Sequence, residues 1–318
     1  MIDGRRTTAG VAFGIGAGAL WGLVFLAPEL AGDFSPLQLT VGRYLAYGVI
    51  AAFLIAPRWR GLSVQLLRRD WIALGWLSLA GNTAYYVLLA SAVQLGGIAM
   101  TSLVIGFLPV AVTLLGSRDV GAAPLGRLWP SLVLCAAGAV CIGWQALVGP
   151  QTGALSAGAA GLACAIGALV SWTGYAVGNS RALARLPAVS SHDWSLLIGL
   201  VTGVQALAMA PAAALFGAAP LDGPGLVKLT GVSVSVAILA SIVGNGLWNR
   251  MSRLLPLTLV GQMILFETLF ALLYGFLWEQ RWPTGLEVAA FVLVVLSVTS
   301  CVAAHRRPGA EAQAAAIV

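Results

Sequence analysis

Apolar runs of about 20 residues recur along this 318-residue chain from one end to the other, and each is long enough for an α-helix to cross a bilayer. Charged residues make up 9% of the sequence and hydrophobic residues 59%, too little polar surface for a water-soluble chain of this size. The runs are continuous rather than alternating in polarity, which favours helices over a transmembrane barrel. The sequence therefore predicts an all-α integral membrane protein.

Glycines, prolines and charged clusters divide these runs into ten expected spans. The spans cover residues 8–31, 36–56, 71–93, 96–116, 127–148, 154–179, 193–216, 226–249, 256–279 and 284–305. Only Gly96-Gly97 separates the third span from the fourth. Arg5 and Arg6 imitate a secretion signal, but the run after them is long and further spans follow, so we expect an uncleaved first helix.

Lysine and arginine fall almost entirely on alternate loops. Fourteen arginines lie on the side that holds both termini, whereas the other side has only Lys228 and Arg281. Because cytoplasmic loops carry the excess of positive charge, both termini are predicted to be cytoplasmic. The net charge of +6 then reflects membrane topology, and we expect no nucleic-acid partner.

Most tryptophans lie near expected span ends, where they are typical of the membrane–water interface. These are Trp59, Trp71, Trp129, Trp144, Trp194, Trp248, Trp278 and Trp282, while Trp76 is ambiguous. Only Trp21 and Trp172 lie well inside their spans.

The two deep tryptophans indicate an internal repeat. Gly18–Trp21 has a counterpart in Gly167-Ala168-Leu169, with Trp172 three residues later. The sequence predicts two five-span halves, 1–150 and 151–318; an odd number of spans in each makes them inverted repeats around a central cavity. A second echo, Gly81-Asn82 and Gly244-Asn245, is weaker because the two asparagines are expected at different depths.

Ten spans in two halves, the segment GALWG (18–22) and the segment LQLTVGRYLAYG (37–48) resemble the drug/metabolite transporter superfamily, with its EamA-like members. The run LPLTLVGQMILFETLFALLYGFLWEQRWP (255–283) resembles more narrowly the YddG-type aromatic amino-acid exporters of bacterial inner membranes. The resemblance implies a basket of helices whose cavity is lined by spans 1, 3, 4, 6, 8 and 9, with spans 5 and 10 at the periphery. It also implies export of amino acids or drug-like metabolites by alternating access.

The span 256–279 carries a carboxylate, Glu267, at its centre. Such a side chain costs roughly 2.5–3.5 kcal/mol to insert and is by default a candidate functional group. Glu267 would bind a substrate ammonium or take up a proton; alternatively it holds neighbouring helices together. Many superfamily members have a proline there, matching Pro109, so we expect the kink to be lost. Gln262 lies on a different face, so the two need not act together.

Arg43 lies inside the second span, roughly 10 Å from its outer end at 1.5 Å per residue. It would attract a substrate carboxylate at an outer vestibule, or it would snorkel outwards or pair with Glu29 or Asp33.

Aromatic and polar side chains at depth complete the candidate substrate site. Large aromatic faces suit a bulky or aromatic substrate and contact an ammonium favourably, although helix packing also uses them. The candidates are Trp21, Tyr85, Tyr86, Trp172 and Tyr175. Polar groups that would bond a zwitterion, or only neighbouring helices, are Asn82, Thr83, Thr101, Ser102, Asn245 and Asn249.

Enzymatic chemistry has little support in this sequence. Both histidines, His192 and His305, lie at the expected cytoplasmic edge, and no hydrolase, metalloprotease or phosphate-loop motif occurs. The four cysteines lack metal-ligand spacing, so we expect neither metal nor cofactor. The sequence predicts a non-ATP exporter of aromatic or large apolar amino acids in a bacterial inner membrane. Protons could be transported with the substrate. Other metabolites or cationic drugs are the alternative substrates. A membrane-embedded enzyme or a scaffold is the remaining alternative function.

Overall fold

The computed structural model of the protein describes residues 4–116, 125–148, 155–219, 222–280 and 282–306, and these ranges are helical with no strand among them. The longer helices are α1 (Gly4–Gly22), α3 (Pro36–Ile55), α5 (Arg68–Ser78), α6 (Ala84–Ile105), α7 (Leu108–Gly116), α8 (Leu125–Val148), α9 (Leu155–Arg185), α10 (Ser191–Leu215), α11 (Gly223–Val236), α12 (Asn245–Leu254), α13 (Leu257–Met263), α14 (Leu265–Glu279) and α15 (Gly285–Arg306). Short segments between them are η1 (Leu23–Leu26), α2 (Ala27–Leu30), η2 (Ala56–Arg58), α4 (Trp59–Ser63), η3 (Leu79–Thr83) and η4 (Ala237–Gly244).

Seven helical stretches in the described ranges are long and apolar enough to cross a membrane. They are Arg5–Leu26, Pro36–Ser63, Arg68–Leu95, Gly158–Arg185, Ser191–Leu215, Gly223–Leu254 and Leu259–Trp278. Two shorter apolar helices, Leu125–Gly138 and Val288–Cys301, lie where the fifth and tenth spans are expected. The all-α membrane fold is therefore confirmed, and seven of the predicted spans meet the length and hydropathy of a membrane helix.

The boundary predicted at Gly96-Gly97 is wrong. Helix α6 includes both glycines and ends at Ile105, and the interruption falls at Gly106-Phe107, before α7. A glycine in a helix costs only about 1 kcal/mol. Breaking a helix within a membrane would leave backbone groups without water to bond them, so the helix continues through the pair.

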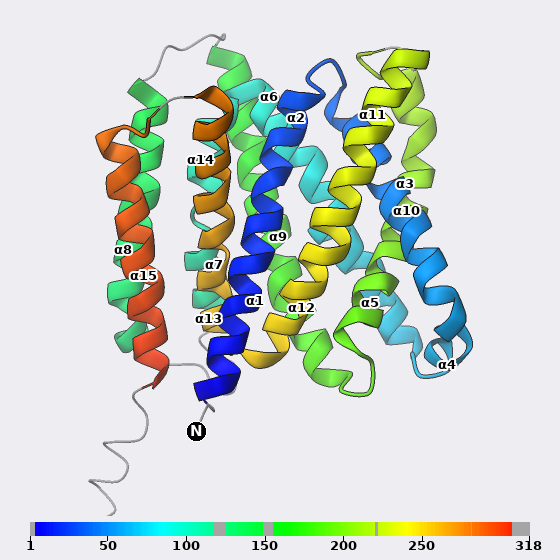
Figure 1. The fold of residues 1–318 in the computed structure, drawn as a ribbon, viewed down its shortest axis with the longest axis horizontal. Helices are drawn as coiled ribbons and strands as arrows, with labels where there is room; N and C mark the ends of the chain where they lie inside the picture. The colour runs from blue at the N-terminus through cyan, green and yellow to red at the C-terminus, as the bar shows by residue number, and fades with distance from the viewer. Residues whose placement is uncertain (1–3, 117–124, 149–154, 220–221, 281, 307–318) are drawn as a thin grey trace, which may run out of the picture.

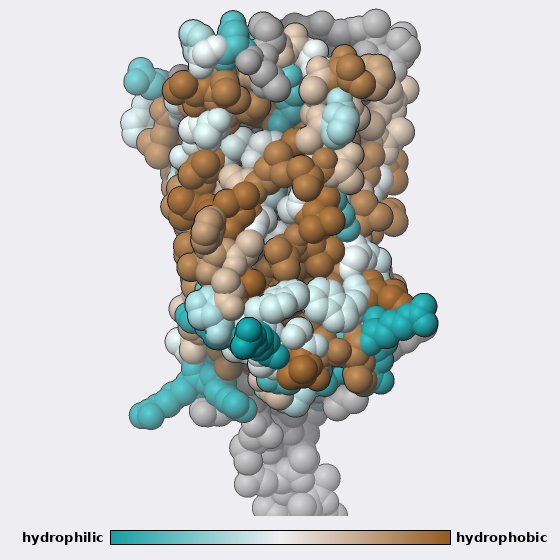
Figure 2. All heavy atoms as spheres, turned by 90° about the vertical axis from the view of Figure 1, so that its right-hand side faces the viewer, coloured by the Kyte–Doolittle hydropathy of each residue, from teal (hydrophilic) through white to brown (hydrophobic). Residues whose placement is uncertain are grey.

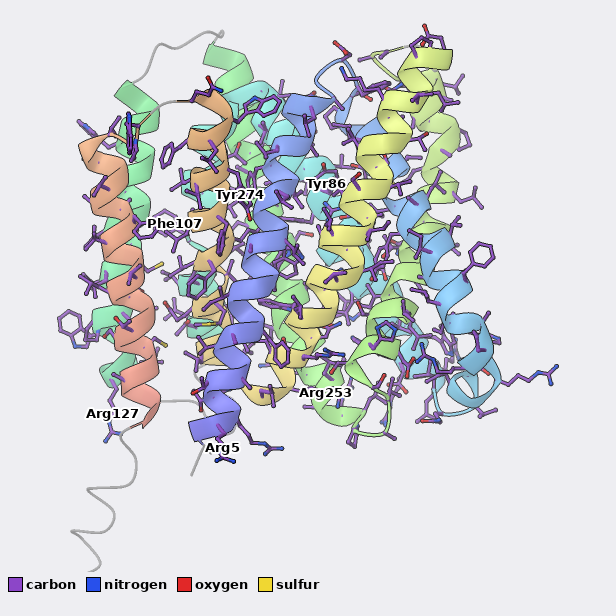
Figure 3. The ribbon with its side chains drawn as sticks, in the orientation of Figure 1. Arg5, Tyr86, Phe107, Arg127, Arg253 and Tyr274 are labelled. Atoms are coloured by element: carbon purple, nitrogen blue, oxygen red, sulfur yellow. The ribbon has the colours of Figure 1, made fainter. Side chains whose placement is uncertain are left out.

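The helices stand side by side in a bundle, with α8 and α15 together at one edge and α3, α10 and α11 at the other (Figure 1). The start of α1 and the end of α15 lie at the same end of the bundle. Arg5, Arg127 and Arg253 gather at that end (Figure 3). The arrangement agrees with the predicted positive end, which carries both terminal helices.

The outer surface of the bundle is apolar across its middle. Figure 2 shows a hydrophobic band on the face formed by the edge with α3 and α10, with hydrophilic groups nearer the ends of the helices. Exposed side chains on those helices include Phe53 (78% exposed) and Leu207 (64% exposed). Exposing such large apolar groups to water is unfavourable, whereas contact with lipid chains is not.

Besides η1, η2 and the interruption at Gly106-Phe107, three further departures from regular α-helix lie within the described part of the bundle. Two are π-helical turns: η3 between α5 and α6, and η4 between α11 and α12. The third is at Ile264, between α13 and α14, three residues before Glu267. The helix is therefore interrupted at Ile264 although the proline is absent, and Glu267 N donates to Ile264 O at 3.0 Å there.

Candidate functional site

The central cavity, a space of about 30 Å³, lies where these breaks meet. A water molecule needs about 10–15 Å³ of such space, so a larger ligand requires the surrounding helices to separate. The lining comes from α1 and η1, α3, η3 and α6, α9, α12 and α14, and comprises Trp21, Val24, Arg43, Tyr44, Gly81, Asn82, Tyr85, Leu89, Trp172, Tyr175, Asn245 and Glu267.

The structure brings most of the predicted site residues together. Those that line the cavity are Trp21, Arg43, Asn82, Tyr85, Trp172, Tyr175, Asn245 and Glu267. Tyr86 is buried behind this wall, against Arg43, in the middle of the bundle (Figure 3). Thr101 is buried away from the lining, and the side chain of Ser102 is outside the described residues. The remaining polar candidates, Thr83 and Asn249, bond to neighbouring helices.

Arg43 is held over two tyrosine rings. Its guanidinium carbon lies 5.0 Å from the ring centre of Tyr44 and 4.7 Å from that of Tyr86, within cation–π range. Its Nε donates to Ser241 Oγ at 3.1 Å. Arg43 is 7% exposed and lines the same cavity as Glu267, and its role as a vestibule charge stays a prediction.

Among the described residues, the predicted pairing of Arg43 with Asp33 is not formed. Asp33 pairs with Lys228 at 2.8 Å, and the side chain of Glu29 is outside the described residues. None of the described ion pairs joins Arg43 to Glu267, although both line the cavity. The cavity therefore presents one cation and one carboxylate to whatever fills it.

Glu267 is placed by its helix and by a glycine. It is the third residue of α14, where the positive end of the helix dipole favours a carboxylate. A Cβ at Gly18 of α1 would lie 2.8 Å from Glu267 N, so only glycine lets the two backbones approach this closely. Gln262, five residues earlier, bonds to Thr113 and Ser297 away from the cavity, as its different face predicts.

Three tryptophans form one contiguous aromatic cluster. Ring centres of Trp21 and Trp172 are 5.8 Å apart, and Trp248 lies 5.0 Å from Trp21 and 5.2 Å from Trp172. Trp248 is 1% exposed, so its predicted role as an interfacial anchor is wrong. The same prediction fails for Trp194, which is fully buried and donates to Asn179 Oδ1 at 2.8 Å.

One polar atom of the cavity lacks a protein partner. The Tyr85 hydroxyl is buried and forms no hydrogen bond with the described residues. A buried unpaired hydroxyl costs about 1–3 kcal/mol. A ligand that bonded this hydroxyl would recover that free energy.

The repeated Gly-Asn pairs, Gly81-Asn82 and Gly244-Asn245, occupy more similar places in the structure than the sequence predicts. Asn82 lies in η3 and Asn245 directly follows η4, and both asparagines line the cavity. The expected difference in depth does not keep them apart, because Asn82 lies within one π-helical turn and Asn245 directly follows the other, and such turns shift the helix register.

Sequence reasoning missed Tyr44, Ser241 and Trp248. Tyr44 follows Arg43 directly, so a search for rings that flank a deep arginine would have found it. Ser241 and Trp248 carry no such signal, because their roles depend on which face of the helix turns inward. Among the described residues, no group of three or more His, Cys, Asp or Glu side chains is placed to hold a metal ion.

Comparison with known proteins gives the family. The chain matches the model of the EamA-like transporter family over residues 8–144 and 159–302. It is 34% identical over 310 residues to the inner membrane protein YtfF of Escherichia coli (strain K12), a match that covers 93% of this chain and 95% of that protein. A crystal structure of another protein shares the fold, with a TM-score of 0.72 and 20% identity over 95% of this chain and 99% of that chain. The predicted resemblance is confirmed at this level: the chain belongs to the EamA-like transporter family of the drug/metabolite transporter superfamily.

Proposed function

We propose that the protein exports amino acids, preferably aromatic or large apolar ones, across a bacterial inner membrane without ATP. The main support for this proposal is that Arg43 and Glu267 line one cavity. The rings of Trp21, Trp172 and Tyr175 line the same cavity. A zwitterion presents a carboxylate to the arginine and an ammonium to the glutamate. The aromatic walls then accept the substrate side chain.

The transport architecture in this proposal is ten spans in two inverted five-span halves. The family match in two stretches of similar length supports two halves. The paired positions of η3 and η4 in the third and eighth spans support an inverted relation between them. Inverted repeats place their substrate site at the interface between halves, where the cavity lies.

The orientation in this proposal has both termini in the cytoplasm. The arginines at the end of the bundle that carries the terminal helices support it, since positive charge favours the cytoplasmic side. The name of the relative YtfF, an inner membrane protein, supports the compartment.

Purified protein in liposomes loaded with labelled tryptophan tests the proposal. We expect tryptophan flux that phenylalanine and leucine inhibit in competition, with and without an imposed pH gradient. If an oppositely directed proton gradient raised the tryptophan flux, and if protons crossed the membrane together with that flux, protons would be the coupling ion. Absence of any flux with a panel of amino acids would overturn the substrate assignment.

Organic cations are the second candidate cargo, because Glu267 and the aromatic rings also suit a quaternary ammonium. Arg43 in the same cavity opposes them by like-charge repulsion. Competition by tetraphenylphosphonium without competition by amino acids would favour this alternative.

A further inference from the structure

We propose that Ser171 and Trp21 are positioning residues that act from opposite halves of the molecule. Each donates a hydrogen bond to a backbone carbonyl of the π-helical turn in the other half, and so places one of the two cavity asparagines. The inference rests on the proposed transport function and adds to it the residues that hold the moving walls of the cavity.

The two hydrogen bonds cross between the halves. Ser171 Oγ in α9 donates to Ala80 O in η3 at 2.8 Å. Trp21 Nε1 in α1 donates to Ala240 O in η4 at 3.1 Å. Thus a donor on the sixth predicted span bonds the third, and a donor on the first bonds the eighth, at equivalent places in the two halves.

A second pair of contacts repeats the pattern from the next helix in each half. Arg43 Nε in α3 donates to Ser241 Oγ in η4 at 3.1 Å. Two side chains of η3, Asn82 and Thr83, donate to Thr202 Oγ1 (3.0 Å) and Gln205 Oε1 (2.8 Å) of α10. Each π-helical turn is therefore bonded by the first two spans of the opposite half.

A glycine in each turn lets a side chain from the first span of the other half come close. Gly81 of η3 faces the ring of Tyr175, and a Cβ there would collide with that ring. A Cβ at Gly244 of η4 would lie 2.8 Å from Trp21 Nε1. The chain thus keeps both turns in contact with the first span of the other half.

The turns determine where the asparagines point. A π-helical turn contains one residue more than an α-helical turn between bonded groups, and such turns are frequent at functional sites. One residue corresponds to about 100° of rotation around the helix axis. A change of register in η3 or η4 therefore rotates Asn82 or Asn245 into or out of the cavity.

The crossed hydrogen bonds also link the two turns to the movement by which the cavity must expand. The cavity holds too little space for an amino acid, so the lining must move during transport. Since each turn is bonded to the opposite half, movement of one half relative to the other pulls on both turns. The crossed bonds couple the movement of the halves to the position of the asparagines.

Hydrogen–deuterium exchange on the protein in lipid nanodiscs, without substrate, tests the crossed pattern. We expect Ser171→Ala to raise amide exchange at least threefold over 79–84 and to leave 237–245 within 1.5-fold of the wild type. Trp21→Phe is expected to do the reverse. The matched control is Thr173→Val, because the Thr173 hydroxyl bonds only Leu169 O of its own helix among the described contacts. Unchanged exchange, or an equal rise in both turns, would overturn the proposal.

Transport kinetics test the link to substrate. We expect Ser171→Ala to raise KM for tryptophan about fivefold, as for the loss of one hydrogen bond, with the maximal rate within twofold. Ser171→Thr, which restores a hydroxyl, should return KM to the wild-type value. An unchanged KM, or a fall in rate that Ser171→Thr does not rescue, would contradict positioning. Were the wild type to carry no amino acid, the proposed function would fail, whereas the exchange pattern would still decide this inference.

Discussion

Two buried polar regions of the bundle differ in whether their groups find partners. The outer polar network consists of Thr113, Ser131, Gln262 and Ser297 from α7, α8, α13 and α15, all fully buried. Gln262 Nε2 donates to Thr113 Oγ1 at 3.3 Å, and Ser297 Oγ lies 2.6 Å from Ser131 O and 3.0 Å from Gln262 Oε1. In the central cavity, the Tyr85 hydroxyl has no such partner among the described residues.

The difference teaches that depth alone does not identify a substrate site. Gln262 and Glu267 lie on the same predicted span, yet Gln262 joins helices and Glu267 lines the cavity. A bonded polar group holds helices together, whereas an unbonded one represents unfavourable free energy that a ligand can remove. The following predictions test that distinction.

Removal of the charge at Glu267 should have the largest effect. We expect Glu267→Gln to lower transport at fixed substrate concentration at least tenfold, because a charge-assisted hydrogen bond is worth about 1.5–3 kcal/mol. The melting temperature of the variant in detergent should stay equal or rise, since a buried charge without a described ion pair is lost. Flux like that of the wild type across pH 6–8 would show that Glu267 is a packing group.

Gln262→Ala should have the converse effect, on stability rather than on transport. It removes contacts to Thr113 and Ser297 and should lower the free energy of unfolding by about 1–2 kcal/mol, measured by thermal melting. Transport per folded molecule should stay within twofold of the wild type. A KM raised as much as in a cavity variant would mean that the network and the cavity are one site.

Removal of a single hydroxyl should have opposite effects in the two environments. Tyr85→Phe deletes an unpaired hydroxyl, so we expect KM to rise about fivefold and stability to stay equal or increase. The matched control, Tyr47→Phe, deletes a hydroxyl that donates to Ser195 O at 2.6 Å. It should lower stability by about 1 kcal/mol, and KM should rise less than in Tyr85→Phe. The same sign of stability change in both variants would contradict the distinction.

Much of the fold was predictable, because the bilayer makes length and hydropathy nearly sufficient to find helices. The sequence could not predict the helix breaks at η3, η4 and Ile264. The η3 carbonyl of Ala80 accepts from Ser171, a residue that is distant in sequence and adjacent only after folding. Gly96-Gly97 misled because glycine weakens a helix without having to end it.

The sequence predicted which residues lie in the site better than it predicted which way their side chains face. Glu267, Trp21 and Asn82 were found from depth, and the cavity contains all three. Trp248 was misassigned because distance from a span end does not show which face a side chain occupies. For Arg43, distance from the span end does not show its neighbours, and the structure places it over the rings of Tyr44 and Tyr86 at the cavity.

An exposed ion pair should have the smallest effect and sets the lower end of the comparison. The Lys228 ammonium donates to Asp33 Oδ2 at 2.8 Å, and both side chains are largely in solvent. That bond holds the pKa of Asp33 below its ordinary value of 3.8. A carboxyl whose pKa is lower in the folded protein stabilises the fold at pH values above its pKa in the unfolded chain. That stabilisation is lost as the pH falls through its pKa in the folded protein. We therefore expect Asp33→Asn to leave transport within twofold and to lower the melting temperature only slightly between pH 5 and 8, where the wild-type carboxylate is charged. That small difference should vanish near pH 3, where the wild-type carboxyl also becomes neutral, and it should shrink in high salt. A loss of melting temperature at pH 7 as large as that of Gln262→Ala would mean that exposure does not weaken a polar contact here, and the contrast between bonded, unbonded and solvated groups would fail.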